Sequence, residues 1–288
     1  MADSASIRKI NLSPCNSIQT VIDELEEHTY EKCIIALEPG VYHEKLNINK
    51  SNLYFYGMGN KPEDVVLDYD DYANIIMDDG TKMGTFRSYS VFVSASNIGF
   101  ENLTIQNSSG DSAIHGQAIA LYDEGDDMTV KDCRIIGHQD TIFLGPLPPK
   151  EIQPGGFVGP TQMAERINRI SHFENTYICG DVDFIFGSGE GYFKNCTIES
   201  LYRESETGIC GYVTAPSTPE GQERGFEFKK CKFIGPECPA ATVYLGRPWR
   251  DWAHAEFIDC EYGPHIHPDR FHDWNKPHAR EVMKFVVK

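Results

Sequence analysis

Two aspartates, each in a short and mainly apolar segment, are candidates for a catalytic pair. Asp140 lies in residues 137–141, and Asp183 lies in residues 181–187, directly before a Phe-Ile-Phe run. A carboxylate among apolar neighbours is costly to bury without a partner. If the two groups lie close together they cannot comfortably both ionise, so one pKa should rise while the other stays low. Such a pair supplies one proton donor and one anion for general acid–base and nucleophilic chemistry.

Other polar and aromatic side chains could complete such a site. Gln117 and Gln139 are neutral donors that suit an oxyanion, although each could equally be a surface glutamine. Arg247, held between a glycine and a proline, could orient a carboxylate with its planar guanidinium. Trp249 offers an apolar face for a sugar ring, although tryptophan more often packs in a core. The two aspartates could also be corner residues that cap strand ends through local hydrogen bonds.

A degenerate six-residue repeat predicts the fold that positions these segments. Each copy carries aromatic and β-branched residues and often has Asn, Asp or Lys at its third position, which indicates a strand that bends at a polar corner. The starts are 30, 43, 20, 35 and 29 residues apart, a spacing typical of a solenoid whose coils carry unequal loops. The copies occupy residues 100–105, 130–135, 173–178, 193–198, 228–233 and 257–262.

Stacking of these repeats brings distant residues together. Equivalent positions on successive coils of a parallel β-helix lie about 4.8 Å apart. Asp140 and Asp183 closely follow the second and third copies, so both could face one side. The cysteines at the fourth position of four copies would form a ladder of buried thiols inside the core. These are Cys133, Cys196, Cys231 and Cys260.

The N-terminal region predicts a helix that covers the open end of the coil. Ile18, Val21, Ile22 and Leu25 have helical spacing after a cap at residue 16 or 17. A helix there would cover apolar core that the first coil leaves exposed. We therefore predict an all-β fold, a right-handed parallel β-helix with a short N-terminal helical cap, as one domain over residues 1–288.

Residues 145–160 interrupt this pattern with five prolines and four glycines. Such a segment cannot be a central strand and predicts a loop. Because it separates Asp140 from Asp183, the loop should project beside the site that they build. A plain surface insertion and a role in shaping a substrate cleft are both open.

Composition excludes several classes of function. The net charge of −17 argues against nucleic acid and disfavours heavily ionised ligands. Neither a membrane-spanning apolar run nor a signal-peptide pattern is visible, so the chain is expected to be cytoplasmic as the sequence stands, or secreted if it is a trimmed form. Nine cysteines without paired spacing do not predict a disulfide framework. We expect a monomer that needs no metal or other cofactor.

Five ordered segments, taken together, resemble the pectin methylesterases (pectinesterases), and the long spacing of the two aspartates resembles the bacterial members. The resemblance implies that Asp183 is a nucleophile toward a methyl ester and that Asp140 protonates methanol and then activates water. It implies that Gln139 and Gln117 are oxyanion donors and that Arg247 holds the nucleophile. It also implies a sugar cleft at Trp249, Phe186, Val182 and Phe143. The segments are residues 40–44, 116–121, 139–141, 183–187 and 245–249.

The predicted function is therefore the removal of methyl esters from methyl-esterified polygalacturonate, either the polymer or its oligomers. His138 departs from the family, in which tyrosine often precedes the Gln-Asp-Thr motif. Two alternatives stay open. One is a β-helical glycosidase or lyase that breaks the sugar chain, and the other is a non-catalytic carbohydrate-binding solenoid.

Overall fold

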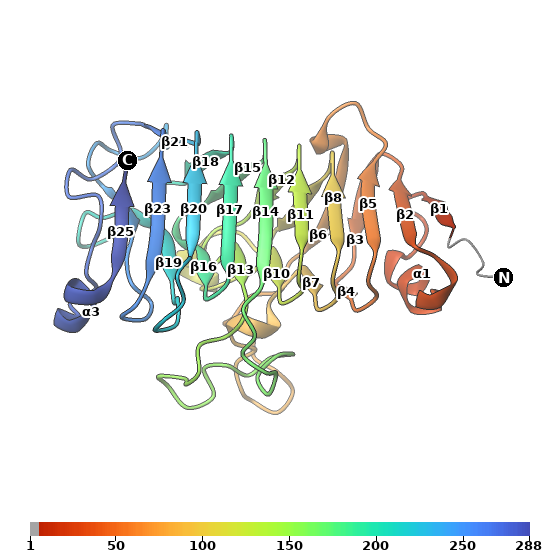
Figure 1. Ribbon diagram of the computed structural model, residues 1–288, viewed down its shortest axis with the longest axis horizontal. Coiled ribbons are helices and arrows are strands. Elements are labelled where there is room, and N and C mark those ends of the chain that lie inside the picture. The colour runs from red at the N-terminus through yellow and green to blue at the C-terminus, as the bar shows by residue number, and fades with distance from the viewer. Residues whose placement is uncertain (1–5) are drawn as a thin grey trace.

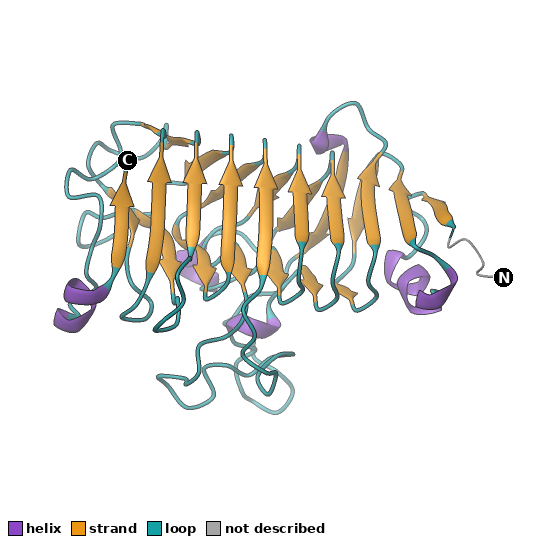
Figure 2. Cartoon of the chain, viewed as in Figure 1, coloured by secondary structure: helices purple, strands orange, loops and turns teal. Residues whose placement is uncertain are grey.

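The chain forms a parallel β-helix built from three sheets that run the length of the molecule (Figures 1 and 2). The computed structural model describes residues 6–288. Each strand pairs in parallel with its equivalent on the next coil, as the repeat predicts. The N- and C-terminal coils therefore lie at opposite ends of the solenoid (Figure 1).

The successive turns from β2 to β22 each contribute one strand to each of the three sheets, and the turns at the two ends contribute fewer. The ten-stranded sheet contains β1 (Ile7–Leu12), β2 (Lys32–Leu37), β5 (Leu53–Gly57), β8 (Ile98–Glu101), β11 (Met128–Lys131), β14 (Ile170–Glu174), β17 (Glu190–Lys194), β20 (Phe226–Lys229), β23 (His254–Ile258) and β25 (Lys284–Val287). The eight-stranded sheet contains β3 (Gly40–His43), β6 (Val65–Tyr69), β9 (Thr104–Asn107), β12 (Arg134–Ile136), β15 (Tyr177–Gly180), β18 (Thr197–Ser200), β21 (Lys232–Ile234) and β24 (Glu261–Tyr262). The seven-stranded sheet contains β4 (Leu46–Ile48), β7 (Val91–Val93), β10 (Leu121–Asp123), β13 (Ile142–Leu144), β16 (Val182–Gly187), β19 (Gly211–Pro216) and β22 (Val243–Gly246).

The six-residue repeat forms the corner between the ten-stranded and eight-stranded sheets. At every copy the third residue has a left-handed backbone, with φ between 51° and 55°. Asn and Asp tolerate this conformation better than most side chains, which explains their frequency at the third position. The six corner residues are Asn102, Asp132, Asn175, Asn195, Lys230 and Asp259.

Side chains at equivalent repeat positions stack inside the solenoid. Phe193 lies 4.6 Å from Phe173 and 4.5 Å from Phe228 between ring centroids, with nearly parallel planes. The nine cysteines are all free thiols, and all but Cys15 and Cys260 are buried. The prediction of buried thiols on a core ladder is therefore confirmed for Cys133, Cys196 and Cys231.

Helix α1 (Ile18–Glu24) covers the N-terminal coil, as predicted. Ile18 and Ile22 are fully buried in the main core, and the Ser17 hydroxyl accepts a hydrogen bond from the Thr20 N–H. The Glu44 carboxylate accepts further hydrogen bonds from the first helical N–H groups, which ties the cap to the end of β3. The remaining helices are α2 (Ser112–His115), α3 (Pro277–Val282) and the 3-10 turns Glu27–Thr29, Pro62–Asp64 and Thr85–Arg87.

Residues 145–169 leave the solenoid after β13 and return at β14 without forming a helix or strand, as predicted for the proline-rich segment. Figure 1 shows this green loop projecting from the body beside the segment before β7. Within residues 6–288, no helix is both long enough and apolar enough to span a membrane.

Candidate active site

Asp140 and Asp183 occupy equivalent positions on neighbouring coils. β13 pairs with β16 so that Ile142 lies opposite Ile185, and each aspartate stands two residues before its member of this pair. Both have a left-handed backbone, with φ of 66° at Asp140 and 51° at Asp183. The register of β16 against β19 also shifts between Val182 and Ile185. This local irregularity interrupts the regular alternation of side chains where the carboxylates lie.

The two carboxylates line one cleft of about 540 Å³ on the outside of the seven-stranded sheet. Only 8% of Asp140 and 7% of Asp183 is exposed, so both are largely buried yet still reached from the cleft. The other candidates that line the same cleft are Gln117, Gln139, Arg247, Phe186 and Trp249. The structure thus brings together residues that span more than 130 positions of the chain.

Arg247 holds Asp183 with both prongs of its guanidinium. Its Nε donates to Oδ1 at 2.8 Å and its Nη2 donates to Oδ2 at 2.7 Å. The rings of Tyr212 and Trp274 lie on the guanidinium, each 3.8 Å from its centre to the ring centroid. A planar cation between two aromatic faces is restrained in the plane that a two-pronged carboxylate contact requires. Asp183 is therefore a fixed, partnered carboxylate.

Asp140 has a different electrostatic environment. Burial and the neighbouring charge of Asp183 raise the pKa of Asp140 well above its usual value. Its carboxylate makes no hydrogen bond with residues 6–288. Burial also raises the pKa of Asp183, where both the charge and the hydrogen bonds of Arg247 oppose the effect, whereas at Asp140 only the charge of Arg247 does. From the sequence we expected the pKa of one aspartate to stay low. Both pKa values rise instead, because both groups are buried. The hydrogen-bonded contact with Arg247 is what distinguishes Asp183 from Asp140.

Gln117 and Gln139 come from the coils of β10 and β13 and present unengaged amide groups. Their backbone carbonyls accept hydrogen bonds from the Ala73 and Ala118 N–H groups, which fixes both main-chain segments. Neither side-chain amide makes a hydrogen bond with any part of the described chain, while both residues line the cleft. Two neutral donors are thus available to a ligand oxygen beside the aspartates.

A row of aromatic side chains along the seven-stranded sheet ends at the floor of the cleft. Phe92, Tyr122, Phe143, Phe186 and Ala215 pair in register across the seven-stranded sheet and pack in one apolar cluster. At Ala215 the row changes from large rings to a methyl group, which leaves room above the sheet. Phe186 and Ala215 line the cleft there.

Two predicted sugar contacts need correction. Phe143 is completely buried, because Phe86, Tyr122 and Phe186 pack around its ring. It packs beside Phe186 on the neighbouring strand and cannot touch a ligand in this conformation. Val182 does not line the cleft either, and its carbonyl accepts a hydrogen bond from the Asp140 N–H at 3.1 Å. Phe186 and Trp249 do line the cleft, and their rings lie 5.6 Å apart.

The loop of residues 145–169 forms one wall of the cleft. Phe157 packs against Phe86 and Trp249 with ring centroids 5.8 and 6.2 Å apart. Residues 152, 153, 155 and 156 of the same loop line the opening. Of the two roles left open for the proline-rich segment, the geometry favours shaping the cleft.

Sequence reasoning missed Tyr212 and Trp274. Tyr212 lies in a buried strand like many others, and Trp274 lies in an irregular segment with no periodic pattern. No local signal relates either residue to Arg247, so only the winding of the chain identifies them. His138 also acquires a partner that its motif did not reveal, since its Nδ1 lies 3.2 Å from a carboxylate oxygen of the buried Asp181.

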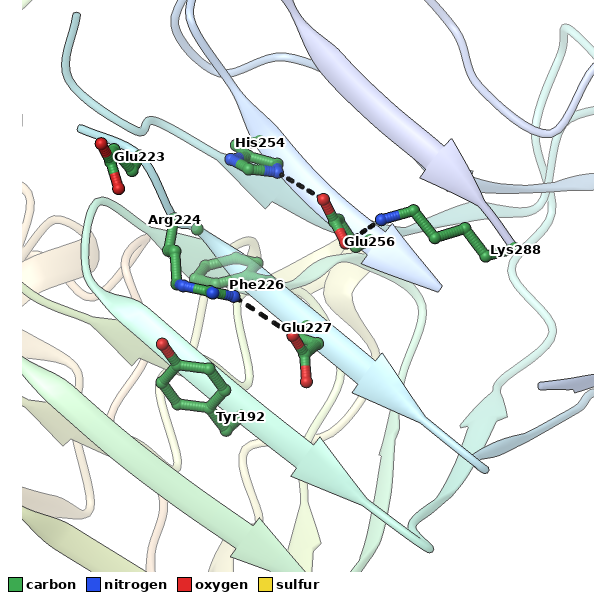
Figure 3. Close-up of a pocket in the computed structure, with 9 residues that line it drawn as sticks. Tyr192, Glu223, Arg224, Phe226, Glu227, His254, Glu256 and Lys288 are labelled. Atoms are coloured by element: carbon green, nitrogen blue, oxygen red, sulfur yellow. Dashed lines mark hydrogen bonds and ion pairs between the residues drawn. The ribbon is translucent and has the colours of Figure 1, made fainter. Parts of the chain in front are cut away.

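A second hollow, of about 270 Å³, lies on the ten-stranded sheet (Figure 3). Most of its charged groups contact one another: Glu256 contacts both His254 and Lys288, and Arg224 lies 3.6 Å from Glu227, whereas Glu223 lines the hollow without such a contact. Three glutamates line this hollow, but the described residues around it include no asparagine or glutamine. The larger cleft is therefore the better candidate for an active site.

Comparison with known proteins agrees with this geometry. The sequence profile described as pectinesterase matches residues 6–145 and 165–286, and thus omits most of the cleft loop. Pectinesterase QRT1 of Arabidopsis thaliana is 28% identical over 277 residues, which cover 93% of this chain and 64% of that protein. The present chain thus spans less than two thirds of the length of this relative.

Solved structures give the same result. Pectin methylesterase PemA from Erwinia chrysanthemi is 26% identical, with a TM-score of 0.75 over 94% of this chain and 83% of that one. A pectin methylesterase in complex with a hexasaccharide is likewise 26% identical, with a TM-score of 0.76 and the same coverage. On the profile match, which covers most of its length, the chain belongs to the pectinesterase family.

Proposed function

We propose that this protein hydrolyses the methyl esters of methyl-esterified galacturonate chains and releases methanol. The observation that carries the proposal is the stacked pair of Asp140 and Asp183 in one cleft, with Arg247 on Asp183 alone. This asymmetry gives one carboxylate the character of an anion and the other the character of a proton donor. Family membership and the aromatic walls of the cleft support this substrate class.

In the first step Asp183 attacks the ester carbonyl carbon. The carbonyl oxygen becomes an oxyanion, and the amides of Gln139 and Gln117 donate hydrogen bonds to it. Asp140, protonated because burial and Asp183 raise its pKa, gives its proton to the departing methoxide. The products of this step are methanol, an acyl group on Asp183 and an ionised Asp140.

In the second step Asp140 acts in the opposite direction. It takes a proton from water, and the resulting hydroxide attacks the acyl carbon. The bond to Asp183 breaks, which releases a galacturonic acid group and restores Asp183 as an anion beside Arg247, and the released acid then loses its proton to the solvent. Asp140 again holds the proton, so the cycle closes without another reactant.

Several features support a carbohydrate chain as the substrate. The cleft crosses several coils of the solenoid, and Phe186 and Trp249 offer apolar faces of the kind that sugar rings pack on. A related pectin methylesterase has been solved with a hexasaccharide bound. Polymer and short oligomers both fit this description.

Product analysis on one sample of methylated pectin tests the proposal. An esterase releases methanol and leaves the chain length unchanged, whereas a glycosidase creates reducing ends and a lyase creates unsaturated products. The Asp183→Asn variant should lose methanol release. Asp259→Asn is the matched control, because it makes the same substitution at a nearly identical backbone angle on a corner outside the cleft.

Normal turnover by the Asp183→Asn variant would overturn the nucleophilic role. Chain cleavage without methanol would favour the hydrolase or lyase alternative. Binding of oligosaccharide by the parent protein without any product would favour the non-catalytic solenoid. The Gln139→Ala variant should lose about 10²–10³ in rate if its amide binds the oxyanion.

A further inference from the structure

A third acid, Asp181, is buried beside the two aspartates of the cleft and takes part in no step of the proposed reaction. Only 1% of Asp181 is exposed. Its Oδ2 accepts a hydrogen bond from the Ser112 hydroxyl at 2.7 Å and lies 3.2 Å from Nδ1 of His138. Its Oδ1 accepts a hydrogen bond from the Val182 N–H at 2.6 Å. Because hydrogen bonds to a carboxylate favour its charged form, these contacts hold Asp181 as a buried anion.

One peptide unit connects this acid to Asp140. Val182 donates its N–H to Asp181, and its carbonyl accepts the N–H of Asp140 at 3.1 Å. The Asp181 N–H in turn donates to the carbonyl of His138 at 3.2 Å. The two segments are therefore joined by backbone hydrogen bonds on either side of the acid, and the contact of the His138 ring adds a side-chain link between the same two coils.

The charge of Asp181 acts on both aspartates of the cleft. Burial and the charge of Asp183 raise the pKa of Asp140, and the charge of Asp181 raises it further. Burial and the charge of Asp181 also raise the pKa of Asp183. There, however, the charges of Arg247 and Lys276 oppose the effect. Asp140 makes no hydrogen bond with Arg247, so it is the carboxyl group on which a third anion favours a bound proton.

We propose that Asp181 is a positioning residue that keeps the proton on Asp140 between turnovers, and that His138 sets the strength of this effect. The inference rests on the proposed function, because it concerns how the same two aspartates of the cleft share a proton. A general acid must hold its proton at the working pH and recover it afterwards. In the second step Asp140 takes a proton from water, and a neighbouring anion makes it a stronger base for that step.

His138 is the residue suited to adjust this charge. Its contact with a carboxylate oxygen requires a proton on Nδ1, which the imidazolium and one neutral tautomer both supply. The side chain is 32% exposed, so the ring can exchange protons with solvent, and within residues 6–288 no lysine or arginine nitrogen lies within 4.0 Å of the Asp181 carboxylate. On the neighbouring helix α2, His115 contacts the ring of Tyr72, and Asp111 accepts a hydrogen bond from its own helix. A charged His138 offsets Asp181, whereas a neutral ring leaves most of its charge in place.

The chain contains the same arrangement at a second place, away from the cleft. Asp68 on β6 is 8% exposed, and its Oδ2 accepts a hydrogen bond from the Ser108 hydroxyl at 3.0 Å and lies 2.8 Å from Nδ1 of His43. β6 lies three strands from β15, which ends directly before Asp181, so the two acids are about 14 Å apart along the solenoid. This is well beyond the Debye length of roughly 8 Å at physiological salt. Replacing Asp68 therefore makes the same chemical change with little effect on the charge at Asp140.

The test is the plot of kcat/KM for methanol release against pH. Asp181→Asn keeps the shape of the side chain but removes its charge, so both limbs should move to lower pH, the basic limb by about one unit. His138→Phe keeps an aromatic ring but removes the donor, and should move the limbs upward by a smaller amount. Combined with Asp181→Asn, the His138 substitution should add no further shift. Asp68→Asn, the matched control, should keep the parent profile.

An infrared titration without substrate separates this inference from the proposed function. A protonated carboxyl group has its own C=O stretch, and the band that is missing in Asp140→Asn belongs to Asp140. In Asp181→Asn this band should disappear at a pH about one unit lower than in the parent. An unchanged midpoint would overturn the proposal, and so would an equal shift in Asp68→Asn. Loss of rate without a shift of either limb would give Asp181 a structural role only, and would overturn it too. The expected infrared shift in a protein that releases no methanol would instead contradict the esterase function.

Discussion

The contact between Arg247 and Asp183 gives the most demanding prediction. Replacing Arg247 by methionine keeps much of the side-chain length but removes the charge and both hydrogen bonds to Asp183. The two side chains are only 16% and 9% exposed, so water cannot replace the lost partner well. Breaking a buried ion pair in this way costs about 3–5 kcal/mol while the remaining group stays charged.

That cost can be expressed as a pKa. At about 1.36 kcal/mol per unit, the loss of Arg247 should raise the pKa of Asp183 by a further 2 to 4 units, approximately. Asp183 must be ionised to attack an ester, so the acid limb of the plot of kcat/KM against pH should move upward by a similar amount. Methanol release at neutral pH should fall steeply, and part of it should return at higher pH.

The loss of Arg247 should also lower the free energy of unfolding, and the raised pKa of Asp183 makes this loss depend on pH. A carboxyl group whose pKa is higher in the folded than in the unfolded chain costs stability above the folded pKa. The cost disappears as the pH falls through the folded pKa toward the unfolded value of about 3.9. The deficit of the Arg247→Met variant in urea unfolding should therefore be large near neutral pH and small near pH 4.

The matched control is Lys194→Met, which breaks an exposed ion pair with Glu174. Such surface pairs contribute about 0–1 kcal/mol, so this variant should unfold like the parent and keep its pH profile. If the Arg247→Met variant also keeps the parent pH profile and rate within a few-fold, the assignment of Asp183 as the Arg-held anion is wrong.

Three further outcomes follow from the same geometry. The Asp140→Asn variant should lose methanol release. It should nevertheless be more stable than the parent at high pH, because the parent must ionise a buried carboxyl group there. The gain in stability should vanish near pH 4, and unfolding measurements at both pH values check this. The Trp274→Ala variant should lower kcat more than it raises KM and should shift the acid limb of the pH profile upward, because Arg247 loses one of its two aromatic faces. The Trp274→Phe variant should keep most of the parent rate. A loss confined to KM would assign Trp274 to sugar binding alone. A thiol reagent should modify Cys15 quickly in the folded protein, Cys260 slowly, and all nine cysteines only after denaturation; rapid modification of several thiols would contradict the buried ladder.

The repeat shows how much of the architecture is local in origin. A left-handed corner every coil favours Asn or Asp, and an aromatic ring two residues earlier stacks on its equivalents, so the pattern repeats wherever the coil does. The corner residues, the cysteine ladder and the capping helix could therefore be predicted from the sequence. The same reasoning placed Asp140 and Asp183 on neighbouring coils, because each follows its repeat at a similar distance.

The details of the cleft depend on contacts between segments far apart in the chain. Phe143 and Phe186 are equivalent in register and in residue type, yet Phe143 is completely buried whereas Phe186 keeps an exposed edge of 4% that lines the cleft, because the cover of Phe86 and its neighbours is complete only over Phe143. No pattern near Phe143 records that cover. Likewise, Trp274 reaches Arg247 through an irregular C-terminal segment whose path has no periodic signal.

The sequence by itself thus determined the coil and its corners, which follow from backbone preference and from repeated burial at a fixed spacing, and its motifs indicated the candidate site residues. Only the tertiary structure decided which aromatic rings restrain Arg247, which rings of the aromatic row are covered, and where the cleft opens. The physical reason is that those outcomes depend on long-range packing and on the burial of charge, and both exist only when the coils have stacked.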